Sequence, residues 1–145
     1  MVIPNKKLNF AIPFQNIINQ LKTFIVMINI DKIDELNDLS IQIYKDLTNI
    51  ITTAMQELKE VVIPDNIYDY DIPYSICYDG GNHPEYDSDC FACVEKIELD
   101  EERIIVHTEY GTEYLECLSN QDLFTIAYLI DFVTNRYETY EKERE

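Results

Sequence analysis

The sequence predicts an α+β protein: an N-terminal helical hairpin, an antiparallel β-meander of three to four strands, and a C-terminal helix packed on the sheet. Three observations lead to this fold class. Apolar residues recur with helical spacing from residue 13 to about residue 59, strand-like runs fill residues 90–118, and a helical pattern returns after residue 119. Hydrophobic residues make up 46% of the 145-residue chain, which is enough for a folded core.

Two helices are expected in residues 1–60, the first over residues 13–28 and the second from a cap at Asp31 to about Lys59. Pro13 suits the first turn of the first helix. Residues 1–30 carry three lysines and no acid. The apolar stripe of the first helix is expected either to cover the meander or to pair with a copy of itself, which would give a homodimer.

Residues 61–145 are expected to hold the meander and the last helix, in one compact unit with the hairpin. Prolines, glycines and tyrosines in residues 61–89 predict short strands and loops. Residues 90–99 and 103–110 alternate as strands do and are joined by Asp-Glu-Glu, and residues 112–118 predict the next strand.

The final helix has a clear start signal. Ser119 or Asn120 caps it, and Asp122 stands three positions after Ser119, as in a capping box. Its apolar stripe runs from Leu123 to Tyr137, and the charged tail at residues 140–145 is expected to fray.

The composition is strongly acidic, with 28 acids against 11 basic residues and a formal charge of -17. This balance disfavours direct binding to nucleic acid or to anionic membranes, because both require positive charge. No targeting segment or membrane span is recognisable, so we expect a cytoplasmic protein whose four cysteines are thiols or metal ligands. A basic protein surface is the partner that such a charge attracts.

Catalytic motifs are missing from the sequence. There is no G-x-S-x-G, no H-E-x-x-H and no glycine-rich phosphate loop, since the chain has three glycines. Cys77 or Cys90 paired with His83 or His107 is conceivable, yet both histidines have ordinary explanations; we expect His107 to face solvent or a neighbouring Glu. No enzyme is predicted, and only carboxylates buried beside His107 or Cys117 would reopen that class.

The segment "YDGGNHPEYDSDCFACVEK" offers two metal hypotheses. Zinc would be held by four residues with the spacing C-x5-H-x6-C-x2-C: Cys77, His83, Cys90 and Cys93. Against zinc, two cysteines three positions apart in a strand face opposite sides. Calcium would use the oxygens of Asp79, Glu85, Asp87 and Asp89, but the loop lacks the glycine and the spaced third acid of an EF-hand. The simpler interpretation is a hairpin with buried cysteines and no cofactor.

The remaining feature is a surface in which acids alternate with tyrosines, in "NIYDYDIPY" and "PEYDSD". Tyrosine offers rigid contact area and carboxylates attract a basic surface. Spaced carboxylates also imitate a row of DNA phosphates, as in the small acidic anti-restriction proteins of phages and plasmids. The alternative is that the charge only keeps the protein soluble. The predicted partner-binding residues are Asp69, Tyr70, Asp71, Asp79, Glu85, Tyr86, Asp87 and Asp89.

Residues 74–135 resemble a group of small acidic proteins of gut Bacteroidota and their phages and mobile elements. The shared pattern is "VEKIELDEERIIVHTEYGTEYLECLS", with V-x-x-I-x-x-x-x-x-x-I-x-V inside it, followed by a helix that begins "SNQDLFTIAYLID". The resemblance implies a fold and no activity. The sequence thus predicts a non-enzymatic acidic interaction module, in its sharper form an inhibitor that mimics DNA. The alternatives are a structural zinc module and a virion or assembly component.

Overall fold

The computed structural model describes residues 16–17, 28–78 and 90–144. The chain divides into two compact units, residues 1–40 and residues 41–145. The helix expected over residues 13–28 lies almost wholly outside the described residues, so the N-terminal hairpin stays a prediction. The division expected at residue 60 falls within the second unit and stays a prediction as well.

The second expected helix is α2 (Ile30–Leu58). Its cap is Asn29, and not Asp31 as predicted: the Asn29 side-chain oxygen accepts from the backbone N–H of Lys32 at 3.2 Å. The helix ends where Lys59 adopts a left-handed conformation, with φ of 66°. In the second unit its buried side chains are Leu47, Ile51 and Met55.

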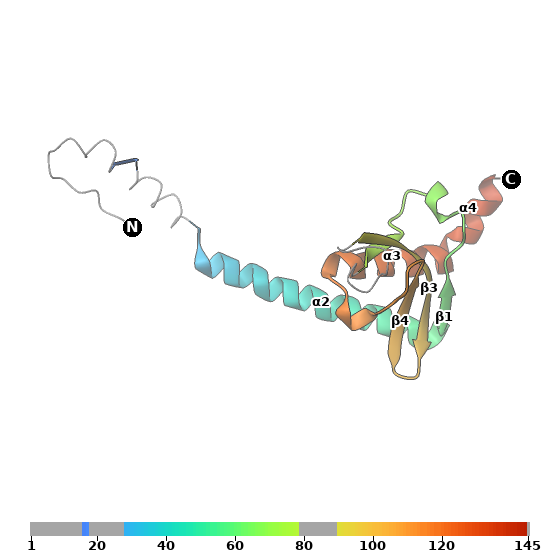
Figure 1. The fold of residues 1–145 in the computed structure, drawn as a ribbon, viewed down its shortest axis with the longest axis horizontal. Helices are drawn as coiled ribbons and strands as arrows, with labels where there is room; N and C mark the ends of the chain where they lie inside the picture. The colour runs from blue at the N-terminus through green and yellow to red at the C-terminus, as the bar shows by residue number, and fades with distance from the viewer. Residues whose placement is uncertain (1–15, 18–27, 79–89, 145) are drawn as a thin grey trace. The chain divides into compact units, whose positions relative to one another are not determined.

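The sheet has five strands, where three to four were expected, and all their pairings are antiparallel. The strands are β1 (Glu60–Val62), β2 (Ser75–Tyr78), β3 (Cys90–Asp100), β4 (Arg103–Thr108) and β5 (Thr112–Tyr114). Strands β3, β4 and β5 form the expected meander, while β1 and β2 both pair with β3. Figure 1 shows β3 between β1 and β4. The strand predicted over residues 112–118 is confirmed for residues 112–114, which form β5, and is wrong beyond them, because residues 115–117 form the 3-10 helix η3.

A β-bulge divides the long strand β3. The register shifts between Val94 and Lys96, so Glu95 is an extra residue that has no paired residue on β4. Before the bulge the buried side chains are Ala92 and Val94, and after it Ile97 is buried. The bulge therefore lets one strand keep its apolar side chains on the core side although their parity changes.

Two helices complete the second unit. Ser119 caps α3 (Asn120–Asn135) as predicted, accepting from the Asp122 N–H at 3.2 Å. α3 contacts β1 and β2, as expected for a helix packed on the sheet, and it also borders residues 50–58 of α2. The tail does not fray: residues 137–144 form a further helix, α4 (Tyr137–Arg144).

Candidate functional site

The candidate site is a surface hollow of about 400 Å³ in the second unit, and aromatic side chains form much of its lining. It borders the segment after the 3-10 helix η1 (Ile67–Asp69), the end of α3 and the start of α4. We call it the tyrosine hollow; its lining residues are Tyr70, Asp71, Ile72, Tyr128, Asp131, Phe132, Arg136 and Tyr140.

The floor of the tyrosine hollow is a cluster of packed rings. Tyr70 lies 4.9 Å from Phe132 and 6.1 Å from Tyr140, measured between ring centroids, and Phe132 stacks on Tyr140 at 5.7 Å. Phe132 is buried and Tyr70 is partly buried, whereas Tyr128 is 56% exposed. The hollow thus combines a preformed apolar floor with an exposed ring, the combination found at the centre of protein interfaces.

A carboxylate ties this cluster together. Glu141 of α4 accepts hydrogen bonds from the Tyr70 hydroxyl, at 2.8 Å, and from the Asn66 amide. The donated bonds of Asn66 and then Tyr70 lower the pKa of the Glu141 carboxyl. Burial first, and then the neighbouring Glu141, raises the pKa of Tyr70. Hydroxyl and carboxylate are therefore in the protonation states that the hydrogen bond requires.

Each of the three arginines pairs with a carboxylate, and Arg103 and Arg144 also lie over a tyrosine ring. The Arg144 guanidinium is 5.5 Å from the centre of the Tyr70 ring and 3.3 Å from Oδ2 of Asp69. Arg136 lines the tyrosine hollow, and its Nε is 3.1 Å from Oδ2 of Asp131. Arg144 is thus a planar cation held by a ring and a carboxylate, while Arg136 is held by a carboxylate.

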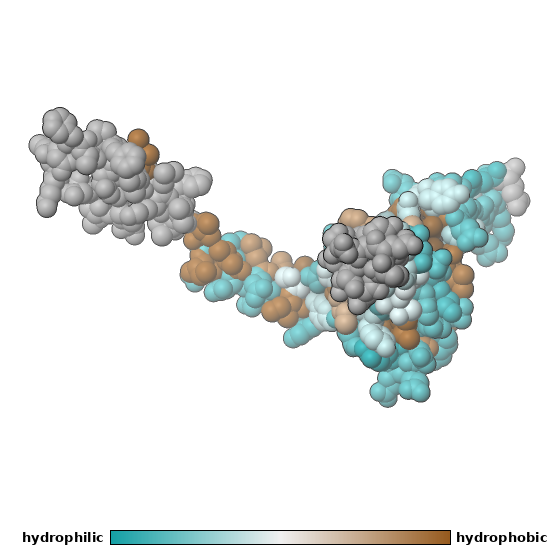
Figure 2. All heavy atoms as spheres, viewed as in Figure 1, coloured by the Kyte–Doolittle hydropathy of each residue, from teal (hydrophilic) through white to brown (hydrophobic). Residues whose placement is uncertain are grey.

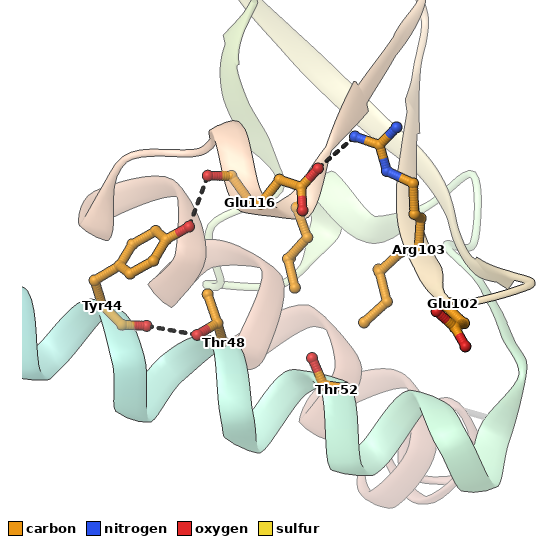
Figure 3. A pocket seen from close by; sticks show the side chains of 8 residues that line it. Tyr44, Thr48, Thr52, Glu102, Arg103 and Glu116 are labelled. Carbon is orange, nitrogen blue, oxygen red and sulfur yellow. Dashed lines mark hydrogen bonds and ion pairs between the residues drawn. The ribbon is translucent and has the colours of Figure 1, made fainter.

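Arg103 shows the same arrangement in a second, more polar pocket of about 260 Å³ between α2 and the β3–β4 hairpin. Its guanidinium lies 3.3 Å from the centre of the Tyr114 ring and is paired with Glu116. Figure 3 shows Arg103 and Glu116 pointing toward each other, while the Tyr44 hydroxyl donates to the Glu116 carbonyl at 2.7 Å. Because the carboxylate already neutralises Arg103, this pocket offers a ligand mainly hydroxyl groups from α2.

The structure places three of the predicted partner-binding residues together. Tyr70 and Asp71 line the tyrosine hollow, whereas Asp69, the residue before Tyr70, does not line it and pairs with Arg144. The other predicted partner-binding residues, and His83, lie outside the described residues: Asp79, Glu85, Tyr86, Asp87 and Asp89.

Zinc also stays a prediction. Within the part of the chain that the structure describes, no group of three or more His, Cys, Asp or Glu side chains is arranged to hold a metal ion. Cys90 lies opposite Tyr78 in register, and Cys93 lies opposite Ser75. Burial and then the nearby Glu109 raise the pKa of the Cys93 thiol, which disfavours the thiolate that zinc or a nucleophilic role requires.

His107 has the neighbour expected from the sequence. Its Nε2 lies 2.6 Å from Oε1 of Glu98, on the face of the sheet where Lys96 also approaches Glu98 at 3.6 Å. The hydrogen bond with His107 lowers the pKa of Glu98. Glu98 is therefore a paired carboxylate and lacks the raised pKa of a general acid.

Sequence reasoning missed the residues of α3 that line the tyrosine hollow. The signal was present, because Phe124, Tyr128 and Phe132 recur at every fourth position and so share one side of a helix. The predicted core face of this helix is its aliphatic stripe, which leaves these rings out. The aromatic flank is what brings α3 against Tyr70.

The surface around these features is predominantly negative. Among the described residues, six of the eight lysines and arginines form ion pairs with carboxylates of the same chain: Lys32, Lys96, Arg103, Arg136, Lys142 and Arg144. Positive charge is thereby cancelled locally, while many carboxylates stay unpaired. Figure 2 shows hydrophilic side chains over the end of the β3–β4 hairpin and over α4.

None of the described helices has the length and apolar character needed to cross a membrane. The function of the chain has to be inferred from the chemistry of its surface. Comparison with family models, with curated proteins and with solved structures finds no match for it.

Proposed function

We propose that this protein is a non-enzymatic, acidic interaction module that binds a basic protein surface, and that an arginine of the partner enters the tyrosine hollow. The observation that carries the proposal is the repeated pairing of a guanidinium with a tyrosine ring and a carboxylate, at Arg103 and Arg144. The surface already holds arginines of its own in this way, and the same groups suit an arginine from outside.

The charges around the hollow support this partner chemistry. Four carboxylates, those of Asp69, Asp71, Asp131 and Glu141, surround two guanidinium groups, which leaves a surplus of two negative charges. Asp71 is exposed and forms no ion pair with the residues that the structure describes. Asp71 would therefore offer the basic partner a carboxylate that neither Arg136 nor Arg144 engages.

The partner class follows from the net charge. A formal charge of -17 steers the protein toward strongly basic surfaces, such as those with which DNA-handling proteins contact phosphates. We therefore propose an inhibitor that mimics DNA, of the kind that phages and mobile elements use against such proteins. Duplex DNA should then compete with this protein for the partner.

The proposal can be tested with a fluorescein-labelled peptide of six arginines, measured by anisotropy against the full-length protein. Tyr128→Ala and Asp71→Asn should each weaken binding about tenfold, because truncating an interface anchor costs about 1.4 kcal/mol or more. A peptide of six lysines should bind more weakly, since an ammonium group does not stack on rings as a guanidinium does.

Matched controls separate the hollow from the general charge. Tyr68→Ala removes a tyrosine that is 67% exposed and does not line the hollow. Glu138→Gln removes one negative charge from a side chain that is 89% exposed. If the controls weaken binding as much as the hollow variants do, or if binding persists unchanged at about 0.5 M salt, the proposal is wrong.

A further inference from the structure

We propose that α4 is an autoinhibitory element, in which Arg144 occupies the position that a partner's arginine takes when the protein binds. This inference rests on the proposed function and adds a regulation at the edge of the tyrosine hollow, because Tyr70 lines the hollow and also contacts Arg144. We call the three residues that hold Arg144 the arginine cradle: Asp69, Tyr70 and Glu141.

The Arg144 guanidinium contacts two carboxylates and one aromatic ring. Its Nη1 and Nη2 each approach Oδ2 of Asp69 at 3.3 Å, and its Nη1 lies 3.9 Å from Oε1 of Glu141. Its guanidinium carbon lies over the Tyr70 ring, 5.5 Å from the centroid. A guanidinium between two carboxylates and over an aromatic ring is the arrangement by which proteins recognise arginine.

The attachment of α4 is weak enough to be released. The helix has eight residues, none of them buried, and its Arg144 side chain is 49% exposed. Exposed ion pairs of this kind contribute little net stability because water and salt screen them. Most of the contact instead comes from the rings of Tyr137 and Tyr140, which pack on Tyr70 and Phe132.

Release of α4 would enlarge the binding surface. Tyr140 stacks on both Tyr70 and Phe132, so its departure exposes the two rings that form the floor of the tyrosine hollow. Glu141 leaves with the helix, so the partner's arginine takes the position of Arg144 against Asp69 and Tyr70, which remain on the segment around η1. An arginine of the partner would thus take the place of Arg144, and an apolar side chain next to it would take the place of Tyr140.

Competition by a tethered group lowers the apparent affinity of an outside ligand. If the cradle is free only a fraction of the time, the apparent dissociation constant rises by the inverse of that fraction. Replacing Arg144 should therefore strengthen binding of the six-arginine peptide, by about 3- to 10-fold if the cradle is free between about a third and a tenth of the time.

The decisive comparison is Arg144→Gln against Lys142→Gln. Both variants remove one positive charge from α4, but Lys142 is 74% exposed and reaches only Glu138, at 3.9 Å. Long-range attraction of the peptide increases equally in both, so the expected 3- to 10-fold tighter binding of Arg144→Gln over Lys142→Gln reports the cradle alone. Circular dichroism of each variant checks that the fold is intact.

A chain ending at Glu141 gives a second test that is independent of charge, because it loses Lys142 and Arg144 together with Glu143 and Glu145. It should bind the peptide about 3- to 10-fold more tightly than the full-length protein does, which is the same factor that is expected to separate Arg144→Gln from Lys142→Gln. In the full-length protein, the peptide should accelerate amide hydrogen exchange in residues 137–144.

The outcomes distinguish the two proposals. Equal binding by Arg144→Gln and Lys142→Gln, with the hollow variants still weakened, overturns autoinhibition and leaves the proposed function standing. Weaker binding by Arg144→Gln makes Arg144 part of the binding surface and also overturns autoinhibition. No arginine-dependent binding by any form overturns both.

Discussion

The Tyr70 hydroxyl donates a hydrogen bond to Oε1 of Glu141 at 2.8 Å, across 71 positions of the sequence. The contact joins the segment after η1 to α4, two elements with little buried surface of their own. It also holds Tyr140 and Arg144 at the tyrosine hollow. This hydrogen bond is thus one of the contacts that attach α4 beside Tyr70.

The contribution of Glu141 to stability should depend on pH. Its folded pKa lies below the ordinary value of about 4.3, because Asn66 and then Tyr70 donate to the carboxylate. The stabilisation is therefore fully present above about pH 4.3 and is lost as the pH falls through the lower folded pKa. Glu141→Gln should lower the melting temperature at pH 7, and the difference from the wild type should shrink below about pH 4.

Melting curves followed by circular dichroism between pH 7 and pH 3 would check this. Glu138→Gln is the matched control, since its side chain is 89% exposed on the same helix. A gap between Glu141→Gln and the wild type that stays constant through the acid range would contradict the account.

Asp122 links the start of α3 to the sheet. Its Oδ2 accepts from the backbone N–H of Cys77 on β2 at 3.2 Å, and the side chain is 6% exposed. Asp122→Ala should destabilise the protein by about 1–3 kcal/mol, because it leaves the Cys77 N–H without this acceptor. Urea unfolding would measure the loss.

Asp122→Asn keeps an acceptor oxygen at the same place and removes the charge. Burial raises the pKa of Asp122, so the charged form is costly there and the amide should be tolerated better than alanine. Equal losses for alanine and asparagine would mean that the contact with Cys77 contributes nothing.

Gly111 lies against the side chain of Tyr78. A Cβ at residue 111 would be 2.5 Å from the Tyr78 hydroxyl oxygen and 3.2 Å from the ring carbon that bears it. Gly111→Ala should cost about 1–3 kcal/mol through overpacking. Because Tyr78→Phe removes the closest atom, the double variant should lose less than the sum of the single losses in a mutant cycle. Additive losses would refute the clash.

The β3–β4 turn contains a strained backbone conformation at Glu101 that a glycine would adopt without strain. Glu101 has φ of 57°, in the left-handed region that non-glycine residues seldom adopt. Glu101→Gly should stabilise the protein by about 0.5–1 kcal/mol, because the relief of about 1–2 kcal/mol exceeds the added chain entropy of glycine. Glu102→Gly removes the same charge at a residue without positive φ, and it should not stabilise. Equal effects on urea unfolding would assign any gain to charge alone.

The local parts of the fold were predictable because short-range physics decides them. Helical periodicity and the Ser119 cap placed α3 correctly, and alternation placed β3 and β4 on either side of the Glu101 turn. The errors concern elements that depend on distant partners. Nothing near Glu60 or Ser75 indicates that both short strands pair with β3, where β2 lies before the bulge and β1 after it.

The candidate site was predictable in its chemistry and only partly in its members. Acids alternating with tyrosines directed attention to Asp69, Tyr70 and Asp71, which the structure places around one hollow. Phe132 and Tyr140 were missed because their contribution depends on how α3 and α4 pack against Tyr70.

The sequence by itself determined the α+β class, the acidic surface and most helix and strand positions, because composition, periodicity and capping act within a few residues. The tertiary structure alone decided that the charged tail forms the helix α4 and that this helix packs against Tyr70 and Phe132. The charged tail has little apolar surface to bury, so it is ordered by contacts with residues far along the chain, Asn66, Asp69 and Tyr70. These partners lie 71 to 75 positions earlier in the sequence, so no local pattern predicts the contacts.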